Sequence, residues 1–229
     1  EMTSSLVGSE MCIRDRAHGV LFLDELTEFD NRTLEVLRQP LEEKVVTISR
    51  LYATYTYPAN FMLVAALNPC KCGYYPDRSK CNCSLQQIKQ YIGKISRPLL
   101  DRIDICVETI PIAYKELTYG KSQESSSVIR ERIKEARKHQ LNRYQKSGKY
   151  FNSQLSPSEV KKYCSLGEKE QKILEQAFTA MNLSARAYHR ILKVARTIAD
   201  LEGKECIEKH HLIEAIGYRG VDRKYWGDA

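Results

Sequence analysis

Hydrophobic runs that end in polar residues predict buried strands in the first half of the chain. Val20 to Leu23 are all apolar and are followed by Asp24 and Glu25. Phe61 to Leu67 are apolar as well and are followed by Asn68. Continuous apolar runs of this length are typical of parallel strands that are buried on both faces. The pattern therefore predicts an α/β fold with a parallel sheet whose strands end in polar side chains.

Other patterns in the first half predict a hairpin, a further strand and two helices. Residues 45–57 are rich in β-branched and aromatic residues and predict a β-hairpin. Ile103 to Ile110 precede a proline and predict a third core strand. The leucine spacing over residues 31–41 predicts a helix, and the sequence SLQQ at residues 84–87 is a capping box that opens another.

The second half of the chain is helical in pattern. Beyond a polar interval at residues 119–127, apolar residues at helical spacing predict a long amphipathic helix. Ser156 to Glu159 combine an N-cap residue, a first-turn proline and a capping-box acid. Three more helices are predicted around residues 173–181, 184–203 and 212–216.

The start of the chain has a different character. Residues 1–16 show neither apolar periodicity nor helix-stop signals, and residues 5–16 resemble a translated cloning or sequencing adapter. We therefore expect residues 1–16 to be a non-native leader and leave them out of the fold prediction.

Composition narrows the function classes only a little. The longest apolar stretch, Phe61 to Leu67, is far shorter than the roughly 20 residues that span a bilayer, and no secretory leader begins the chain. We expect a cytoplasmic protein without a membrane partner. The net charge of +7 favours polyanionic partners such as DNA, although many basic proteins do not bind nucleic acid.

Four of the eight cysteines lie in one short stretch and predict a metal site. They form the two close pairs Cys70-x-Cys72 and Cys81-x-Cys83, and Gly73 permits a turn between them. Four thiolates close a tetrahedral structural Zn²⁺ site and leave no open position for catalysis. Disulfides are the alternative, which a cytosolic setting disfavours.

The polar residues at the ends of the predicted strands indicate a site that binds and hydrolyses nucleotides. Asp24 is placed to hold Mg²⁺ beside phosphates, Glu25 to polarise an attacking water, and Asn68 to orient that water or contact the γ-phosphate. The carboxyl ends of parallel strands are where open sheets bind ligands. The alternative is that Asp24 and Glu25 only mark a strand leaving the core.

Four segments carry a resemblance to a known family. They are GVLFLDEL at residues 19–26, LRQPLE at 37–42, VAALNPC at 64–70 and PLLDRID at 98–104. From about Ala17 to Trp226 the chain resembles the Mg-chelatase-like AAA+ ATPases of the competence-associated ComM/YifB group.

The resemblance implies roles for five residues. Asp24 and Glu25 would be the Walker B acids, Asn68 sensor 1 and Arg186 sensor 2. Arg102 would be an arginine finger that acts on the nucleotide of a neighbouring subunit, so the resemblance implies a hexamer that uses ATP and Mg²⁺. Without the family, the favoured interpretation of Arg102 is a surface ion pair with Asp101 or Asp104, and that of Arg186 is a solvated helix face.

The resemblance also implies a domain organisation. Residues 17–112 would form a partial AAA+ P-loop NTPase core with a β-hairpin insert and the four-cysteine zinc loop, and residues 113–229 a linker helix and a C-terminal α-helical lid. Similar cysteine-rich inserts occur in the ComM/YifB group. The phosphate-binding sequence GxxxxGK[ST] is absent from these 229 residues. We therefore expect the chain alone to be inactive and the full-length protein to hydrolyse ATP.

The predicted hairpin is the candidate DNA contact. In related helicases a hairpin at this place lines a pore, and Arg50 would present its charge to a phosphate backbone. The alternative is a surface arginine, with Tyr52, Tyr55 and Tyr57 in ordinary cross-strand packing. The basic residues between Lys134 and Lys146 fit a solvated helix face, and we assign the histidines no role.

Three functions remain open at this stage. The first is a hexameric ATP-dependent helicase that translocates on single-stranded DNA or migrates branched DNA. The second is a chelatase-like ATPase that remodels a protein or metal-insertion complex, which the four-cysteine insert disfavours. The third is a non-enzymatic zinc-containing interaction module.

Overall fold

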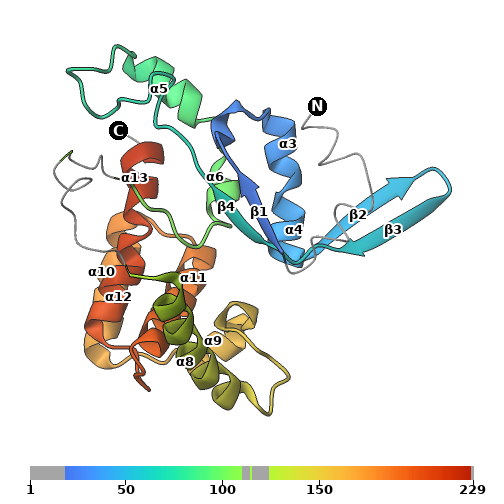
Figure 1. Ribbon diagram of the computed structural model, residues 1–229, viewed down its shortest axis with the longest axis vertical. Coiled ribbons are helices and arrows are strands. Elements are labelled where there is room, and N and C mark those ends of the chain that lie inside the picture. The colour runs from blue at the N-terminus through green and yellow to red at the C-terminus, as the bar shows by residue number, and fades with distance from the viewer. Residues whose placement is uncertain (1–18, 110–113, 115–123, 228–229) are drawn as a thin grey trace. The chain divides into compact units, whose positions relative to one another are not determined.

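The chain divides into two units in the computed structural model, which describes residues 19–109, 114 and 124–227 (Figure 1). The first unit comprises residues 1–103 and 224–229, and the second comprises residues 104–223. The predicted leader and the predicted domain boundary at residues 112 and 113 lie outside the described residues.

The first unit contains a short parallel sheet. Strand β1 (Val20–Leu23) pairs in parallel with β4 (Met62–Ala65), which confirms that the two apolar runs lie side by side. The expectation of burial on both faces is wrong: Leu21 and Leu23 are buried, whereas the side chain of Phe22 is 59% exposed. Alternate residues of a strand point to opposite faces, and the core of the first unit lies against the face of Leu21 and Leu23.

The third predicted strand is not observed. Residues 103–109 have no regular structure, and Ile105 and Val107 are exposed. The backbone N–H of Cys106 donates instead to the carbonyl of Tyr218, at 3.1 Å. A strand exists only where a neighbour pairs with it, so an apolar run without such a neighbour remains irregular.

Short helices cover the inner face of the sheet. The 3₁₀ turn η1 (Leu26–Glu28) is followed by α3 (Asn31–Val36), α4 (Arg38–Glu43) and later α6 (Arg97–Leu100). The side chain of Asp30 caps α3 by accepting from the amides of Arg32 and Thr33. The core below the sheet contains Leu21, Leu23, Leu26, Leu34, Leu37, Leu41, Ile95, Leu99 and Leu100.

The predicted hairpin is confirmed as β2 (Val45–Arg50) and β3 (Ala53–Pro58), which pair antiparallel (Figure 1). Tyr57 lies opposite Val46 and Tyr55 opposite Ile48, as cross-strand packing requires. Tyr52 is different, because it lies in the turn and its side chain is 95% exposed.

A second cluster of the first unit joins the cysteine loop to helix α5 (Leu85–Ile92), whose capping box between Ser84 and Gln87 is present as predicted. The last helix, α13 (Gly220–Trp226), has no predicted counterpart. The indole Nε1 of Trp226 donates to the carbonyl of Ile92 at 3.1 Å, so the end of this helix belongs to the first unit.

The second unit is helical, as the sequence predicts. Its core is built by the contacts of a long central helix with its neighbours and contains Tyr144, Leu155, Val160, Leu174, Ile191, Leu192, Ala195 and Leu212. Capping residues appear where they are expected, at Ser156 with Glu159 and at Ser184. The elements are α8 (Ser126–Tyr144), η2 (Asn152–Gln154), α9 (Pro157–Tyr163), α10 (Glu168–Met181), α11 (Ala185–Leu201) and α12 (Lys209–Gly217).

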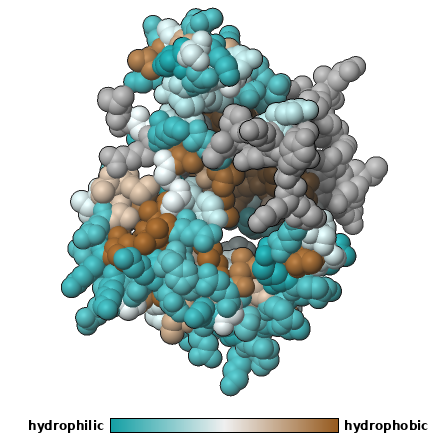
Figure 2. All heavy atoms as spheres, turned by 60° about the vertical axis from the view of Figure 1, so that its left-hand side comes forward, coloured by the Kyte–Doolittle hydropathy of each residue, from teal (hydrophilic) through white to brown (hydrophobic). Residues whose placement is uncertain are grey.

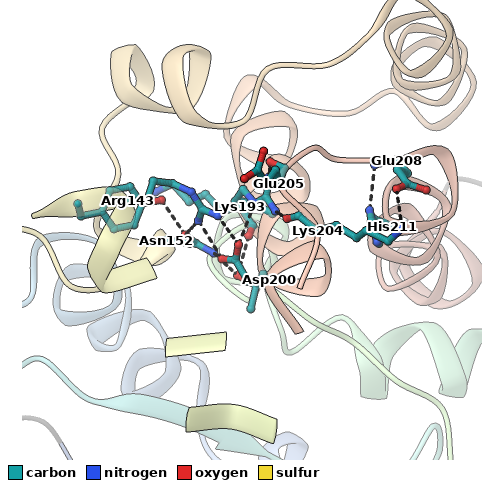
Figure 3. Close-up of polar contacts among 11 residues, drawn as sticks. Arg143, Asn152, Lys193, Asp200, Lys204, Glu205, Glu208 and His211 are labelled. Atoms are coloured by element: carbon teal, nitrogen blue, oxygen red, sulfur yellow. Dashed lines mark hydrogen bonds and ion pairs between the residues drawn. The ribbon is translucent and has the colours of Figure 1, made fainter. Parts of the chain in front are cut away.

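A buried polar network links α8, η2 and α11 (Figure 3). The carboxylate of Asp200 accepts two hydrogen bonds from Arg143, at 2.5 and 3.0 Å, and one from Asn152, at 2.9 Å. The Nε of Arg196 donates to the same carboxylate at 3.1 Å. Each partner satisfies a polar group that would be costly to bury alone.

Hydrophilic residues cover most of the face drawn in Figure 2, where the apolar residues form separate patches. Among the described residues, exposed apolar side chains include Phe22 and Met62 on the open face of the sheet and Leu51 and Tyr52 at the hairpin tip. None of the helices in the described ranges combines the length and apolar content needed to cross a membrane.

Candidate functional site

The two acids of the candidate site directly follow β1. Asp24 and Glu25 are both exposed, and the Oδ1 of Asp24 accepts from the amide of Glu25 at 2.9 Å. Glu25 has a φ of 49°, a left-handed conformation that is uncommon for a residue with a side chain. The chain thus turns sharply at the strand end and leaves both carboxylates accessible.

Asn68 lies beyond the end of the neighbouring strand. Backbone hydrogen bonds of 2.9 Å continue the pairing past the strands, from Ala66 to Leu23 and from Leu26 to Ala66. The segment that bears the acids and the segment that leads to Asn68 therefore run side by side at one edge of the sheet. The proposed roles of Asp24, Glu25 and Asn68 stay predictions.

Two residues of α5 and its C-terminal loop lie beside the turn after β1, and the sequence carried no signal for them. The Nζ of Lys94 donates to the carbonyl of Thr27 at 2.6 Å and lies over the ring of Tyr91. Burial is the largest cause of a raised pKa at Tyr91, and the carboxylates of Glu28 and Glu25 add to it. Only the tertiary fold brings these side chains to the acids.

Arg102 is held inside the first unit. Its guanidinium forms an ion pair with Glu42 and donates to the carbonyl of Pro98 at 2.6 Å. The nearby Asp104 instead pairs with Arg190, in the second unit. The observed ion pair of Arg102 is thus with Glu42, sixty positions earlier in the chain, and was not anticipated from the residues alone.

Arg186 and Arg50 are exposed and lie far from these contacts in the chain. Arg186 occupies the first turn of α11 and belongs to the second unit, which is described here by itself. Arg50 is the last residue of β2, directly before the exposed turn of the hairpin. The sensor 2 role of Arg186 and the DNA contact of Arg50 stay predictions.

The four clustered cysteines converge on one point. Four of the six sulfur–sulfur distances among Cys70, Cys72, Cys81 and Cys83 run from 3.3 to 3.8 Å, and all four sulfurs lie within 4.8 Å of one another. None of the four forms a disulfide. Four thiolates about 2.3 Å from a central Zn²⁺ lie about 3.8 Å apart in a tetrahedron. The donor set therefore fits a structural zinc ion, which these four residues would hold.

The local backbone supports this arrangement. Gly73 has a φ of 78°, a conformation that favours glycine, so the predicted turn is confirmed. A hydrogen bond from the amide of Tyr74, followed by one from Cys70, lowers the pKa of Cys72 to about 6. Burial raises the pKa of Cys81 to about 11, so ionisation of all four thiols would require the charge of a bound metal ion.

Two histidines without an assigned role also meet an acid. Glu202 contacts the Nε2 atoms of His210, at 2.9 Å, and of His211, at 3.1 Å. The Nδ1 of His211 accepts the amide of Glu208 at 2.9 Å, a contact visible in Figure 3. Neutral imidazole has one donor and one acceptor nitrogen, so Nε2 carries the proton and donates to Glu202. A metal ion would need a free lone pair at Nε2 of His211, and the proton occupies that position. The contacts of Glu202 with the two histidines therefore serve to hold the end of α11 against α12.

Comparisons with known proteins place these features in a family. A family described as "Magnesium chelatase, subunit ChlI" matches residues 4–117, and its C-terminal counterpart matches residues 123–219. The competence protein ComM of Haemophilus influenzae is 44% identical over 207 residues. The chain belongs to the Mg-chelatase-like family that includes ComM and YifB. YifB of Escherichia coli is 41% identical over 211 residues, and YifB of Salmonella typhimurium 40% over 208.

This member of the ComM/YifB family corresponds to part of its relatives. The aligned residues make up 90% of this chain but 40% of ComM and of both YifB proteins. Its mixed α/β architecture with a small parallel sheet and helices is consistent with part of an AAA+ fold. The family supports nucleotide chemistry in general.

Proposed function

We propose that the full-length protein is an oligomeric AAA+ ATPase that couples ATP hydrolysis to movement along single-stranded or branched DNA. The observation that carries the ATPase part is the juxtaposition of Asp24 and Glu25 with the Asn68 segment at one edge of a parallel sheet. The magnesium chelatase family supports it. The DNA part rests on the net charge of +7, the exposed hairpin, and kinship with a protein named for competence.

Each site residue has a specific task in this proposal. Asp24 would hold the Mg²⁺, which would supply positive charge to the phosphates, and Glu25 takes a proton from the attacking water. Asn68 orients that water, and Arg186 contacts the nucleotide from the helical unit. Arg102 reaches the nucleotide of a neighbouring subunit and stabilises charge in the transition state, so the active form is a ring, for which we favour a hexamer.

Replacing the proposed general base tests the ATPase assignment. In the full-length protein, Glu25→Gln is expected to lower ATP turnover about 100-fold or more, because general-base catalysis is worth at least that much. Glu28→Gln is the matched control, since Glu28 is an exposed acid three residues further along. Turnover of the Glu25 variant within a factor of two of the wild type would refute the assignment.

The hairpin tests the DNA assignment, because its two candidate contacts differ in chemistry. Arg50→Ala is expected to weaken binding of single-stranded DNA and to reduce the slope of log K against log salt by about 0.7, the loss of one phosphate contact. Tyr52→Ala is expected to cost about 1–3 kcal/mol through lost base stacking and to leave the slope unchanged. Lys80→Ala removes a charge elsewhere in the first unit and serves as the control. Wild-type binding by both hairpin variants would exclude the hairpin as the DNA contact.

A further inference from the structure

The side chain of Arg102 is enclosed to a degree that conflicts with free reach toward another subunit. It is 9% exposed, and both terminal nitrogens of the guanidinium donate within the first unit, to Glu42 and to the carbonyl of Pro98. The Nε of Arg102 is buried and has no hydrogen-bond partner among the described residues. In this conformation the guanidinium has few donors available for a phosphate.

Glu42 is the side chain that holds Arg102 inward. It lies near the C-terminal end of α4, and its side chain is 38% exposed, so the acidic member of the ion pair is the more accessible one. A second carboxylate, that of Glu35, accepts hydrogen bonds from Ser96 and Arg38. Hydrogen bonding to Ser96 and then to Arg38 lowers the pKa of Glu35, and the charge of Arg102 contributes to the same shift. Glu42 is therefore the acceptor that Arg102 must leave in order to move outward.

We propose that Glu42 is a positioning residue that competes with the nucleotide phosphate of a neighbouring subunit for the guanidinium of Arg102. This inference rests on the proposed function, in which Arg102 acts in trans. A guanidinium binds carboxylate and phosphate through the same fork of N–H donors, so the two acceptors exclude each other. Glu42 thereby keeps Arg102 ordered before assembly and releases it when a phosphate is presented.

The competition predicts the direction in which kcat/KM for ATP changes when Glu42 is replaced. When only a fraction of a protein is in the binding-competent state, its apparent affinity is reduced by that fraction. Weakening the Glu42 contact enlarges the outward population of Arg102 and raises kcat/KM for ATP. A merely structural ion pair would give the opposite sign, because its loss would disorder the site and lower the rate.

The test is the ATP turnover of the assembled full-length protein. Glu42→Gln keeps the size of the side chain and is expected to raise kcat/KM by about two- to fivefold, the range of a partly exposed ion pair. Glu43→Gln is the matched control, because Glu43 lies on the same helix and accepts from Gln39 at 2.9 Å. Glu42→Asp retains the charge and is expected to stay within about twofold of the wild type. An unchanged or lower kcat/KM for Glu42→Gln would overturn the proposal.

The same substitution in an Arg102→Ala protein tests the role of Glu42 separately from the role of Arg102. In an Arg102→Ala protein, Glu42→Gln is expected to change nothing, because the residue acts only through the guanidinium. An increase in that background would overturn the proposal. Wild-type turnover of Arg102→Ala itself would instead show that the trans-acting role of Arg102 is wrong. Loss of turnover in Arg102→Ala together with no gain in Glu42→Gln would overturn the positioning role alone.

Discussion

At the scale of single residues, the charges of the second unit fall into a buried network and a set of surface pairs. Asp200 and Arg196 are almost fully buried, and the carboxylate of Asp200 accepts hydrogen bonds from both Arg196 and Arg143. The pairs Glu131 with Lys134 and Glu135 with Lys138 lie on the exposed side of α8, as expected for a solvated face. The same expectation is wrong for Arg143, whose side chain is largely buried in the ion pair with Asp200. Burial rather than the number of ion pairs decides which of these contacts matters for stability.

Breaking the buried network is expected to be costly. Asp200→Asn removes the only negative charge that the described structure places between Arg143 and Arg196, so two guanidinium groups would be left without compensation. We expect the free energy of unfolding to fall by about 3 kcal/mol or more. The surface variant Glu135→Gln should change it by less than about 0.5 kcal/mol. Urea unfolding followed by circular dichroism measures both, and equal effects would contradict this ranking.

The capping box at Ser156 predicts a pH dependence. An ion pair with Lys149 and hydrogen bonds from Ser156 lower the pKa of Glu159 to about 2. The unfolded chain has the ordinary glutamate pKa of about 4.3, so the stabilisation is complete above that value and is lost as the pH falls toward 2. The difference in melting temperature between the wild type and Glu159→Gln should therefore shrink from pH 6 to pH 2. A difference that is constant over this range would show that the carboxylate is not stabilised by folding.

At the scale of elements, the cysteine loop is a segment whose conformation depends on its side chains rather than on backbone pairing. Residues 69–83 form turns, and their buried members are Cys70 and Cys81. A loop of this length needs an internal cross-link to hold one conformation. The four sulfurs lie close enough together for a metal ion to supply it.

Removal of one sulfur ligand is expected to abolish metal binding. Cys81→Ser replaces a buried ligand at almost constant size and should reduce the zinc content from about one equivalent to near zero, because structural sites use all four ligands. Cys206→Ser is the control, since Cys206 is exposed in the second unit. Elemental analysis of both purified variants makes the comparison. Full zinc content in the Cys81 variant would exclude the four-cysteine site.

At the scale of the whole molecule, the open face of the β1–β4 sheet predicts further chain in contact with it. Val20, Phe22, Met62 and Val64 expose one apolar face, whereas parallel sheets are normally covered on both sides. ComM is longer than this chain, since the aligned region makes up 40% of its length. We expect additional residues of the full-length protein to cover this face.

A charged residue on the open face is expected to affect the full-length protein and the 229-residue chain differently. Phe22→Asp is expected to lower the stability of the full-length protein by about 3 kcal/mol or more, because it would bury an unpaired carboxylate. In the 229-residue chain the same change should cost less than about 1 kcal/mol, since the position is exposed. Thermal unfolding of both proteins measures the loss of stability that Phe22→Asp causes in each. Equal losses would show that the face stays open in the full-length protein.

The amino-acid sequence by itself determined the features that depend on local chemistry. Capping residues at Ser84, Ser156 and Ser184, the hairpin, the helices of the second unit and the clustered cysteines were all predicted correctly. Each depends on residues close together in the chain, where spacing and side-chain type directly express the hydrogen bonds to be made.

Only the tertiary structure decided the features that depend on distant neighbours. The run from Ile103 is strand-like in sequence but has no pairing partner among the described residues, and Phe22 is apolar but uncovered. Glu42 and Arg102 are sixty residues apart, so no local pattern announces their ion pair. Because burial and charge pairing are properties of the space around a side chain, the enclosed position of Arg102 became visible only in the folded protein.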